Sequence, residues 1–312
     1  MTALTVIRGG MLTTVQDLGR WGQQHHGVPV AGPMDWYSHR LANRLVGNGD
    51  EVAALEMTLL GPELTADGDV LCAVAGAPFE IAANGVPMPP HASFTLPRGH
   101  RLTMRTMRSG GAGARATLAV RGGIDVPAVF GSRATSLISG IGPFGGRALA
   151  SGDILPVGRP SMSNRPPGRP LPVPQGGARM RVLWGPHADR FSAGAIRALH
   201  SSRYTITPDS NRMGYRLDGT PLAAVATGWT DMLSDATPVG SLQVPPSGLP
   251  ILLMADRQTT GGYPKIATVI SADLPLAGQL VPGDWIEFVP ITRAAAVEAL
   301  RRREADLAGA AG

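Results

Sequence analysis

One segment, residues 158–178, limits what this chain can fold into. It contains Pro160, Pro166, Pro167, Pro170, Pro172 and Pro174 and almost no periodic apolar pattern. Proline fixes its own backbone angle and lacks an N–H donor, so such a run forms an extended, stiff connection. We therefore predict an N-terminal β lobe at residues 1–157, a proline-rich linker at 158–178 and a C-terminal β lobe with a terminal helix at 179–312.

The glycine and proline content indicates the fold class. The chain of 312 residues has 41 glycines and 28 prolines without a collagen-like period, which is typical of short strands joined by tight turns. Asn84-Gly85 between apolar runs predicts a type I′ hairpin. Strands and helices do not alternate regularly, which argues against a parallel doubly wound sheet. We predict a mainly β fold with two β-barrel-like lobes and a few peripheral helices.

The helices and the opening of the chain are predicted from caps and apolar spacing. We expect the chain to open with a loop that leads to a helix after Pro33, which ends at Gly47. A second helix is expected at about 188–199, and Thr292 is expected to cap a last helix that ends near Leu307.

Charge and cysteine content restrict the location and the partners. Cys72, the one cysteine, lies in an apolar run, so no disulfide forms within the chain and the thiol is a poor nucleophile. Residues 1–10 do not resemble a signal peptide, and no apolar run reaches the ~20 residues of a membrane span. The net charge of +5 is scattered and not interleaved with aromatic residues. We predict a cytoplasmic protein that binds neither nucleic acid nor membranes.

Several catalytic and cofactor motifs are absent or lack their structural context. Gly140, Gly142 and Gly145 match a dinucleotide-binding glycine pattern, but Pro143 interrupts it and no strand–turn–helix context is expected. The sequence has no phosphate-binding P-loop motif and no G-x-S-x-G motif. Its adjacent histidines, His25 and His26, are poorly placed to share one metal ion. We therefore predict no metal site and no simple hydrolase triad.

The first candidate site lies between residues 13 and 35. Gln16, Asp17 and Arg20 stand among glycines, which let a ligand approach the backbone closely. Asp17 and Arg20 are also spaced to form an ion pair that only holds the loop together, and Asp35 stands where a helix cap is expected. We predict Asp17 as a catalytic group and the other three as substrate-binding residues, with the structural alternatives left open.

The second candidate site is residues 256–265, between two apolar runs. A simple hairpin loop needs only a few turn residues, whereas this segment offers charged, amide, hydroxyl and phenol groups. Of the 28 basic residues only Lys265 is a lysine, and arginine cannot replace lysine where a compact ammonium is required. Gly261 and Gly262 could form an anion-binding nest. We predict Lys265 and Arg257 as catalytic, and as substrate-binding residues Gln258, Thr259, Thr260, Gly261, Gly262 and Tyr263.

Several long motifs occur in the order found in one known family. They are Thr13-Thr14-Val15-Gln16-Asp17, Gly32-Pro33-Met34-Asp35, Leu55-Glu56-Met57-Thr58, Gly131-Ser132-Arg133-Ala134-Thr135, Arg212-Met213-Gly214-Tyr215-Arg216-Leu217, Gln243-Val244-Pro245, Asp256-Arg257-Gln258-Thr259-Thr260-Gly261-Gly262-Tyr263-Pro264 and Pro282-Gly283-Asp284. On these motifs nearly the whole chain resembles the biotin-dependent carboxyltransferase-like family. That family includes the PxpC or KipA type of subunit of bacterial 5-oxoprolinase, allophanate hydrolase subunit 2-type proteins and part of urea carboxylase. Ala31 and Asn211 depart from the serine and aspartate expected there.

The resemblance implies cyclophilin-like β lobes and a subunit of an ATP-dependent complex that opens 5-oxo-L-proline to L-glutamate. It implies a KipI/PxpB-like and a PxpA-like partner, with ATP bound with or by a partner subunit, and it places both candidate segments in one shared site. There we expect Lys265 and Arg257 to stabilise developing charge, and Gln258 and Gln16 to orient the substrate. Asp17 would act as a base or a positioning group.

Two alternatives stay open within the same family. The chain could be the carboxyltransferase part of a biotin-dependent urea or amide carboxylase. Lys265 is not flanked by methionines, so carboxybiotin would then come from another chain. It could also be a KipA-type regulatory partner of a kinase inhibitor, with no catalysis of its own.

Overall fold

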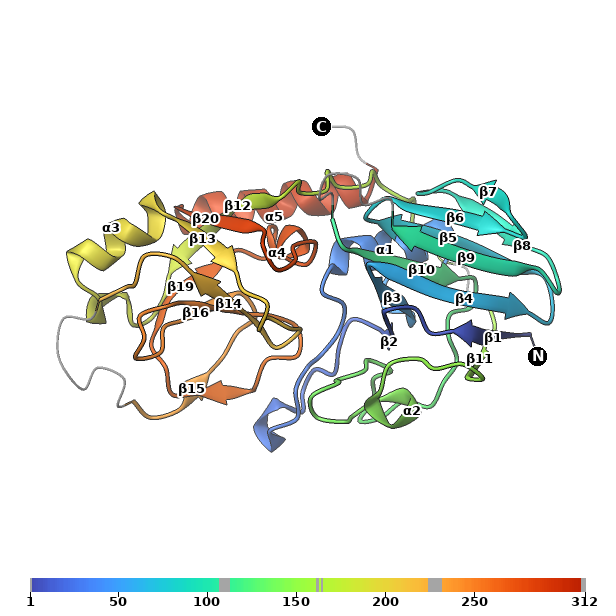
Figure 1. Ribbon diagram of the computed structural model, residues 1–312, viewed down its shortest axis with the longest axis horizontal. Helices are drawn as coiled ribbons and strands as arrows, with labels where there is room; N and C mark the ends of the chain where they lie inside the picture. The colour runs from blue at the N-terminus through green and yellow to red at the C-terminus, as the bar shows by residue number, and fades with distance from the viewer. Residues whose placement is uncertain (1, 107–112, 161–162, 164, 224–231, 310–312) are drawn as a thin grey trace. The chain divides into compact units, whose positions relative to one another are not determined.

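The computed structural model describes residues 2–106, 113–160, 163, 165–223 and 232–309 (Figure 1). The chain divides into two compact units. Unit 1 comprises Met1–Trp21, Ala31–Val173 and Glu304–Gly312, and unit 2 comprises Gly22–Val30 and Pro174–Arg303. One division falls inside the proline-rich segment, but each unit is assembled from discontinuous parts of the chain.

Unit 1 is built from two antiparallel sheets. The six-stranded sheet has the order β11 (Ile154–Pro156), β1 (Ala3–Arg8), β4 (Leu60–Ala66), β9 (Arg101–Thr106), β6 (Phe79–Ala83), β7 (Val86–Met88). The five-stranded sheet has the order β2 (Leu12–Gln16), β3 (Ala54–Thr58), β10 (Arg115–Val120), β5 (Val70–Gly76), β8 (Ser93–Leu96). The described strands of this unit therefore form two sheets and not a closed barrel.

The core of unit 1 lies between these two sheets. Leu4 and Leu102 from the first sheet and Leu55 from the second belong to one fully buried apolar cluster. On the other face of the five-stranded sheet, α1 (Trp36–Leu45) packs Tyr37 and Leu41 against alanines of β3, β5 and β10. Small side chains on these strands let the helix approach closely, so α1 covers this face of the sheet.

Local predictions in unit 1 were partly right. Asn84 (φ 48°) and Gly85 (φ 82°) both have positive φ between β6 and β7, as a type I′ hairpin requires, so that prediction is confirmed. The predicted opening loop is wrong, because residues 3–8 and 12–16 form β1 and β2. Every residue of β2 after Leu12 is buried, so its polar side chains are interior groups and not loop groups.

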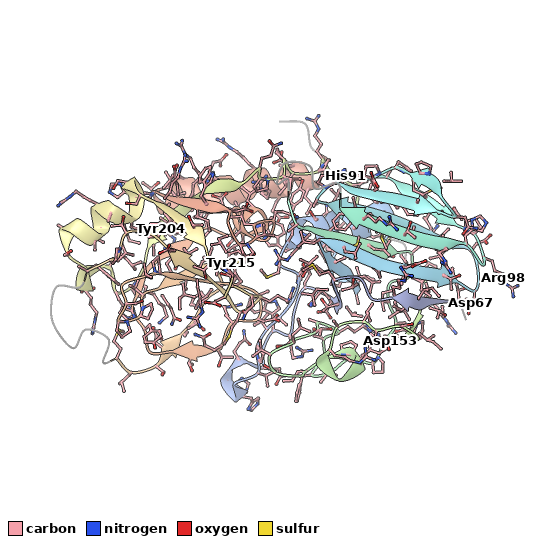
Figure 2. The ribbon with its side chains drawn as sticks, in the orientation of Figure 1. Asp67, His91, Arg98, Asp153, Tyr204 and Tyr215 are labelled. Atoms are coloured by element: carbon pink, nitrogen blue, oxygen red, sulfur yellow. The ribbon has the colours of Figure 1, made fainter. Side chains whose placement is uncertain are left out.

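Unit 2 is a closed barrel of seven strands (Figure 1). Their order is β12 (Gly177–Trp184), β19 (Lys265–Val269), β16 (Ser241–Gln243), β17 (Ile251–Leu253), β14 (Gly214–Asp218), β13 (Arg203–Ile206), β20 (Trp285–Pro290), and β20 pairs in parallel with β12. Tyr204, Tyr215 and Phe288 are among its fully buried side chains. Figure 2 labels the two tyrosines. The Tyr204 hydroxyl donates to the Thr220 carbonyl at 3.1 Å, and burial raises the Tyr204 pKa to about 12.

The remaining elements are short, apart from the last helix. They are η1 (Gln24–His26), α2 (Pro143–Gly146), η2 (Ala188–Arg190), α3 (Ala193–Ser201), β15 (Asp235–Ala236), β18 (Thr260–Gly261), α4 (Leu274–Ala277) and α5 (Arg293–Leu307). Thr292 caps α5 as predicted, since its Oγ1 accepts from Ala295 N at 3.2 Å. The helix predicted at 188–199 is split, because Ser192 caps a separate helix through Ala195 N.

The predicted mainly β class with few helices is confirmed. Among the described residues no helix is long and apolar enough to cross a membrane. Cys72 is buried in β5, and burial raises its pKa to about 12, so the thiol is not a nucleophile at neutral pH.

Candidate functional site

In unit 1, Asp17 binds the loop at residues 129–136. Its Oδ1 accepts from Ser132 Oγ at 2.6 Å and from Gly19 N at 3.0 Å, and its Oδ2 accepts from Arg133 N at 2.6 Å. Three donors therefore converge on one carboxylate directly after β2. A carboxylate held in this way is suited to positioning a loop.

Gln16 and Arg20 bind the same loop through its carbonyl groups. Gln16 Nε2 donates to the Thr135 carbonyl at 3.0 Å. Arg20 donates through Nε to Val129 and through Nη2 to Ala134, both at 2.7 Å. Both side chains are fully buried. The structure thus brings together two sequence motifs, Thr13–Asp17 and Gly131–Thr135, that lie far apart along the chain.

Asp35 is the N-cap of α1. Its Oδ1 accepts from Ser38 N at 2.9 Å and its Oδ2 accepts from Ser38 Oγ at 2.6 Å. This is the capping alternative that the sequence left open. One turn later, His39 is fully buried, and burial lowers its pKa to about 4. The nearby carboxylates of Asp17, Glu56 and Asp50 raise this pKa but do not outweigh the effect of burial.

His39 and Glu56 were not predicted as site residues. Glu56 Oε2 accepts from Met34 N at 2.6 Å and is buried. The sequence feature that could have indicated Glu56 is the family motif at residues 55–58, in which a glutamate stands between the apolar residues Leu55 and Met57.

The loop attachment gives a testable expectation for Asp17. Asp17→Asn removes the charge that strengthens three hydrogen bonds, so we expect a loss of about 1–2 kcal/mol in the free energy of unfolding. Amide hydrogen exchange in residues 129–136 should accelerate with it. Asp125→Asn is a matched control, because Asp125 bonds Arg133 of the same loop from an exposed position. Unchanged exchange in Asp17→Asn would contradict the assigned role.

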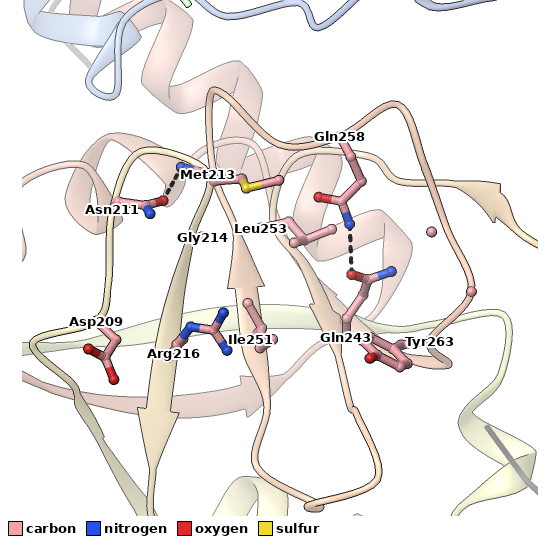
Figure 3. Close-up of a pocket in the computed structure, with 12 residues that line it drawn as sticks. Asp209, Asn211, Met213, Gly214, Arg216, Gln243, Ile251, Leu253, Gln258 and Tyr263 are labelled. Atoms are coloured by element: carbon pink, nitrogen blue, oxygen red, sulfur yellow. Dashed lines mark hydrogen bonds between the residues drawn. The ribbon is translucent and has the colours of Figure 1, made fainter. Parts of the chain in front are cut away.

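In unit 2, part of the second candidate segment lines a cavity of about 290 Å³ (Figure 3). Its lining residues are Asp209, Asn211, Met213, Gly214, Arg216, Gln243, Ile251, Leu253, Gln258, Gly261, Gly262 and Tyr263. Four of them, Gln258, Gly261, Gly262 and Tyr263, are predicted substrate-binding residues. The other polar lining residues, Asp209, Asn211, Arg216 and Gln243, were not predicted as site residues, although Arg216 and Gln243 lie in the family motifs at residues 212–217 and 243–245.

A buried ion pair fixes the start of this segment. Arg212 Nε and Nη2 donate to the two carboxylate oxygens of Asp256 at 3.1 and 3.2 Å. The next residue, Arg257, donates through Nε to the Thr237 carbonyl at 2.7 Å. Burial lowers the Arg257 pKa to about 10, an effect that the neighbouring Asp256 opposes. Arg257 therefore holds the backbone at residue 237 and is not one of the cavity-lining residues.

A short two-stranded ribbon carries the glycine pair. β15 and β18 pair Asp235 with Gly261 and Ala236 with Thr260. Thr237 N donates to the Thr259 carbonyl at 3.1 Å, and Thr237 Oγ1 donates to the Gln258 carbonyl. Thr259 and Thr260 thus serve the ribbon through their backbones. A Cβ at Gly261 would lie 2.6 Å from Gln243 Nε2, so any larger residue there would require the Gln243 amide to move.

Lys265 is a buried cation at the start of β19. Its side chain is 2% exposed, and Nζ lies 3.5 Å from Asp235 Oδ2. Among the residues that the structure describes, Nζ has no hydrogen-bond partner. Lys265 N donates to His187 Nδ1 at 3.2 Å. Burial, and then the Lys265 ammonium, lower the His187 pKa.

The predicted residues therefore fall into two groups. Gln16, Asp17, Arg20 and Asp35 belong to unit 1, whereas residues 256–265 belong to unit 2. In unit 1, Gln16, Asp17 and Arg20 all bind the loop at residues 129–136, whereas Asp35 caps α1. Neither unit contains, among its described residues, a group of three or more His, Cys, Asp or Glu side chains that could hold a metal ion.

Comparison with known proteins assigns the family. The sequence profile of the carboxyltransferase domain, subdomains A and B, matches residues 26–290. The chain belongs to this carboxyltransferase domain family. The resemblance seen in the motifs is thereby confirmed.

Members of the carboxyltransferase domain family with similar sequences carry two kinds of name. The chain is 41% identical to the C subunit of Escherichia coli 5-oxoprolinase in an alignment of 307 residues that covers 96% of this chain and 94% of that protein. It is 36% identical to the C subunit of Haemophilus influenzae 5-oxoprolinase, covering 93% and 92% of the two chains. The solved structure of Kluyveromyces lactis urea amidolyase matches with a TM-score of 0.91 and 31% identity, over 98% of this chain and 20% of that one.

Proposed function

We propose that this chain is the C subunit of a 5-oxoprolinase that converts 5-oxo-L-proline to L-glutamate with hydrolysis of ATP. The observation that carries the proposal is the 41% identity to the Escherichia coli protein along 96% of this chain and 94% of that one. Neither of the two proteins has a large region that the other lacks. As a subunit, the chain is inactive alone and forms a hydrolase with its partners in the cytoplasm.

The chemistry requires activation of a stable lactam. ATP supplies the phosphoryl group that activates the amide oxygen. Negative charge is concentrated on the oxygens of the transferred phosphoryl group, and a buried cation stabilises it more strongly than an exposed one. Lys265 has this property, since its ammonium is buried and makes no hydrogen bond with the described residues. Arg257 contributes indirectly to the same site, because its guanidinium holds the backbone at residue 237 in place.

The polar groups of unit 1 contribute by positioning. Asp17 already accepts three hydrogen bonds, so we assign it the positioning role and not that of a base. Gln16 and Arg20 fix the same loop, whose residues then face the substrate or a neighbouring subunit. That both candidate segments serve one shared site stays a prediction from the family resemblance.

The proposed partners are a KipI/PxpB-like subunit and a PxpA-like subunit. The sequence has no P-loop motif, so ATP would be bound with or by a partner. This division of labour agrees with a subunit whose own polar groups recognise and polarise a small substrate.

A carboxyltransferase function is the second candidate. The TM-score of 0.91 to Kluyveromyces lactis urea amidolyase favours it, although this chain spans only 20% of that protein. In that case the buried Lys265 ammonium would stabilise the negative charge of the carboxyl group during its transfer from carboxybiotin, carried by another chain, to urea or an amide.

Reconstitution separates the two functions. The full chain, purified with its KipI/PxpB-like and PxpA-like partners, is supplied with 5-oxo-L-proline and ATP, and glutamate and ADP are measured. We expect glutamate release that requires all three subunits and is coupled to ADP formation. Full activity without this chain would overturn the proposal, and labelled carboxyl transfer from carboxybiotin to urea would favour the second candidate.

A further inference from the structure

The cavity of unit 2 has two chemically different ends. Figure 3 shows Arg216 and Asp209 on one side and Gln243 and Gln258 on the other. Met213, Ile251 and Leu253 supply apolar surface between them. A site with a cation and an acid at one end and amides at the other selects ligands by the order of their polar groups.

The amide end presents an unused donor. Gln258 Nε2 donates to Gln243 Oε1 at 3.1 Å, which fixes the orientation of the Gln243 amide. Gln243 is 2% exposed, and its Nε2 has no hydrogen-bond partner among the described residues. Buried amide donors are nearly always satisfied, so this one marks a place for an acceptor from outside the chain.

The surroundings of Gln243 make that donor part of a connected cluster. Gln243 on β16 lies opposite Lys265 on β19. Lys265 Nζ lies 3.5 Å from Asp235 Oδ2, and Asp235 is the strand partner of Gly261. Gly261 in turn packs next to Gln243 Nε2. The amide donor and the buried ammonium therefore occupy one region beneath the β15–β18 ribbon. A carbonyl oxygen is the acceptor that suits a neutral donor next to a cation.

The opposite end matches a carboxylate next to an N–H group. The Arg216 guanidinium offers a planar pair of donors for a carboxylate. Asp209 lines the same side of the cavity in Figure 3 and can accept a hydrogen bond from an N–H. The apolar floor between the ends suits ring methylenes.

We propose that this cavity binds a small carboxylate that also carries an amide or lactam carbonyl. Arg216 receives the carboxylate and Gln243 Nε2 donates to the carbonyl oxygen. The proposal rests on the proposed function, since 5-oxo-L-proline, the substrate of that function, belongs to this class of ligand. It makes Gln243 a specificity-determining residue, a role that the sequence did not predict.

The test uses three matched probes and the full chain, with binding measured by calorimetry and ligand-observed NMR. 5-Oxo-L-proline has both groups, 2-pyrrolidinone has the lactam without the carboxylate, and L-proline has the carboxylate with a charged ring ammonium in place of the lactam. We expect 5-oxo-L-proline to bind at least tenfold more tightly than either of the others. Equal binding of the three probes, or no binding of any at millimolar concentration, would overturn the proposal.

Two variants assign the ends of the cavity. Arg216→Ala should weaken 5-oxo-L-proline binding at least tenfold and leave 2-pyrrolidinone unaffected. Gln243→Leu should weaken both lactams and leave L-proline unaffected, with a melting temperature no lower than that of the Gln258→Leu variant, which loses the same amide–amide bond. Ser241→Ala is the matched control, since Ser241 is buried on the same strand and does not line the cavity.

The outcomes separate the inference from the proposed function. If the probe pattern holds but the reconstituted complex releases no glutamate, the binding site stands and the proposed function fails. If glutamate release is normal while Gln243→Leu and Arg216→Ala bind all probes as the wild type does, the binding site is wrong and the function stands.

Discussion

Lys265→Met is expected to lower the kcat of glutamate release by the complete complex at least 100-fold, while the chain stays folded. Removing one preorganised donor or cation at a developing oxyanion costs roughly this factor in other enzymes. Stability should not fall, because Lys265 Nζ is buried with one ion-pair partner, 3.5 Å away, in the part of the chain that the structure describes, and burial of a weakly paired charge is itself unfavourable. The measurement is steady-state kinetics of the complex, with thermal unfolding of the isolated chain.

The ion-pair partner provides the discriminating control. If Lys265 only neutralised Asp235, then Asp235→Asn would reduce kcat as much as Lys265→Met does. Asp235 is largely exposed, so we expect its removal to have a much smaller effect. Lys265→Arg should not restore activity, since a guanidinium is larger than the space that a buried ammonium fills. A Lys265→Met complex with full ATP-coupled turnover would exclude the catalytic role.

Features with a local cause could be predicted from the sequence. Asn84-Gly85 requires positive φ at both positions, and few residues other than asparagine and glycine tolerate it, so the hairpin was predicted. Thr292 caps α5 through an interaction three residues away. Strand β2 was missed, because Thr13, Thr14 and Gln16 are polar and are buried only through contacts made by distant parts of the chain.

The site could be predicted as residue types but not as geometry. The segment 256–265 contains more functional groups than a turn needs, and Gln258, Gly261, Gly262 and Tyr263 do line a cavity. Gln243 was not predicted as a site residue, because nothing local shows that its amide is buried beneath Gly261. The discontinuous composition of the two units likewise depends on contacts that a proline-rich segment does not reveal.

His39 should make the stability of the protein depend on pH in the weakly acidic range. Asn43 explains why this side chain is neutral. Asn43 Oδ1 accepts from Asn48 at 3.0 Å and its Nδ2 donates to the Val52 carbonyl at 2.8 Å, which fixes the orientation of the amide. Nδ2 is then the donor to His39 Nε2, 3.3 Å away, so Nε2 is an acceptor and carries no proton. Protonation of Nε2 would place its N–H opposite the N–H of Asn43 Nδ2, and two donors cannot form a hydrogen bond with each other.

The sign of the pH effect follows from the two pKa values. The His39 pKa is about 4 in the folded protein, below its ordinary value of 6.5, so the unfolded chain binds the proton first as the pH falls. Stability is therefore fully present above pH 6.5 and is lost as the pH falls toward 4. The shift corresponds to about 3 kcal/mol at most. Urea unfolding followed by circular dichroism between pH 7 and pH 4 measures it.

His39→Gln isolates this contribution, because glutamine has no titrating group and keeps an acceptor near Asn43. Its free energy of unfolding should be lower than that of the wild type at pH 7 and should fall far less between pH 6.5 and pH 4. The carboxylates of Asp17, Glu56 and Asp50 favour the charged imidazole, so they reduce the shift that burial produces. Asp17→Asn should therefore lower the His39 pKa further and steepen the loss of stability in acid. Parallel pH profiles for the wild type and His39→Gln would show that the imidazole is accessible to protons in the folded state.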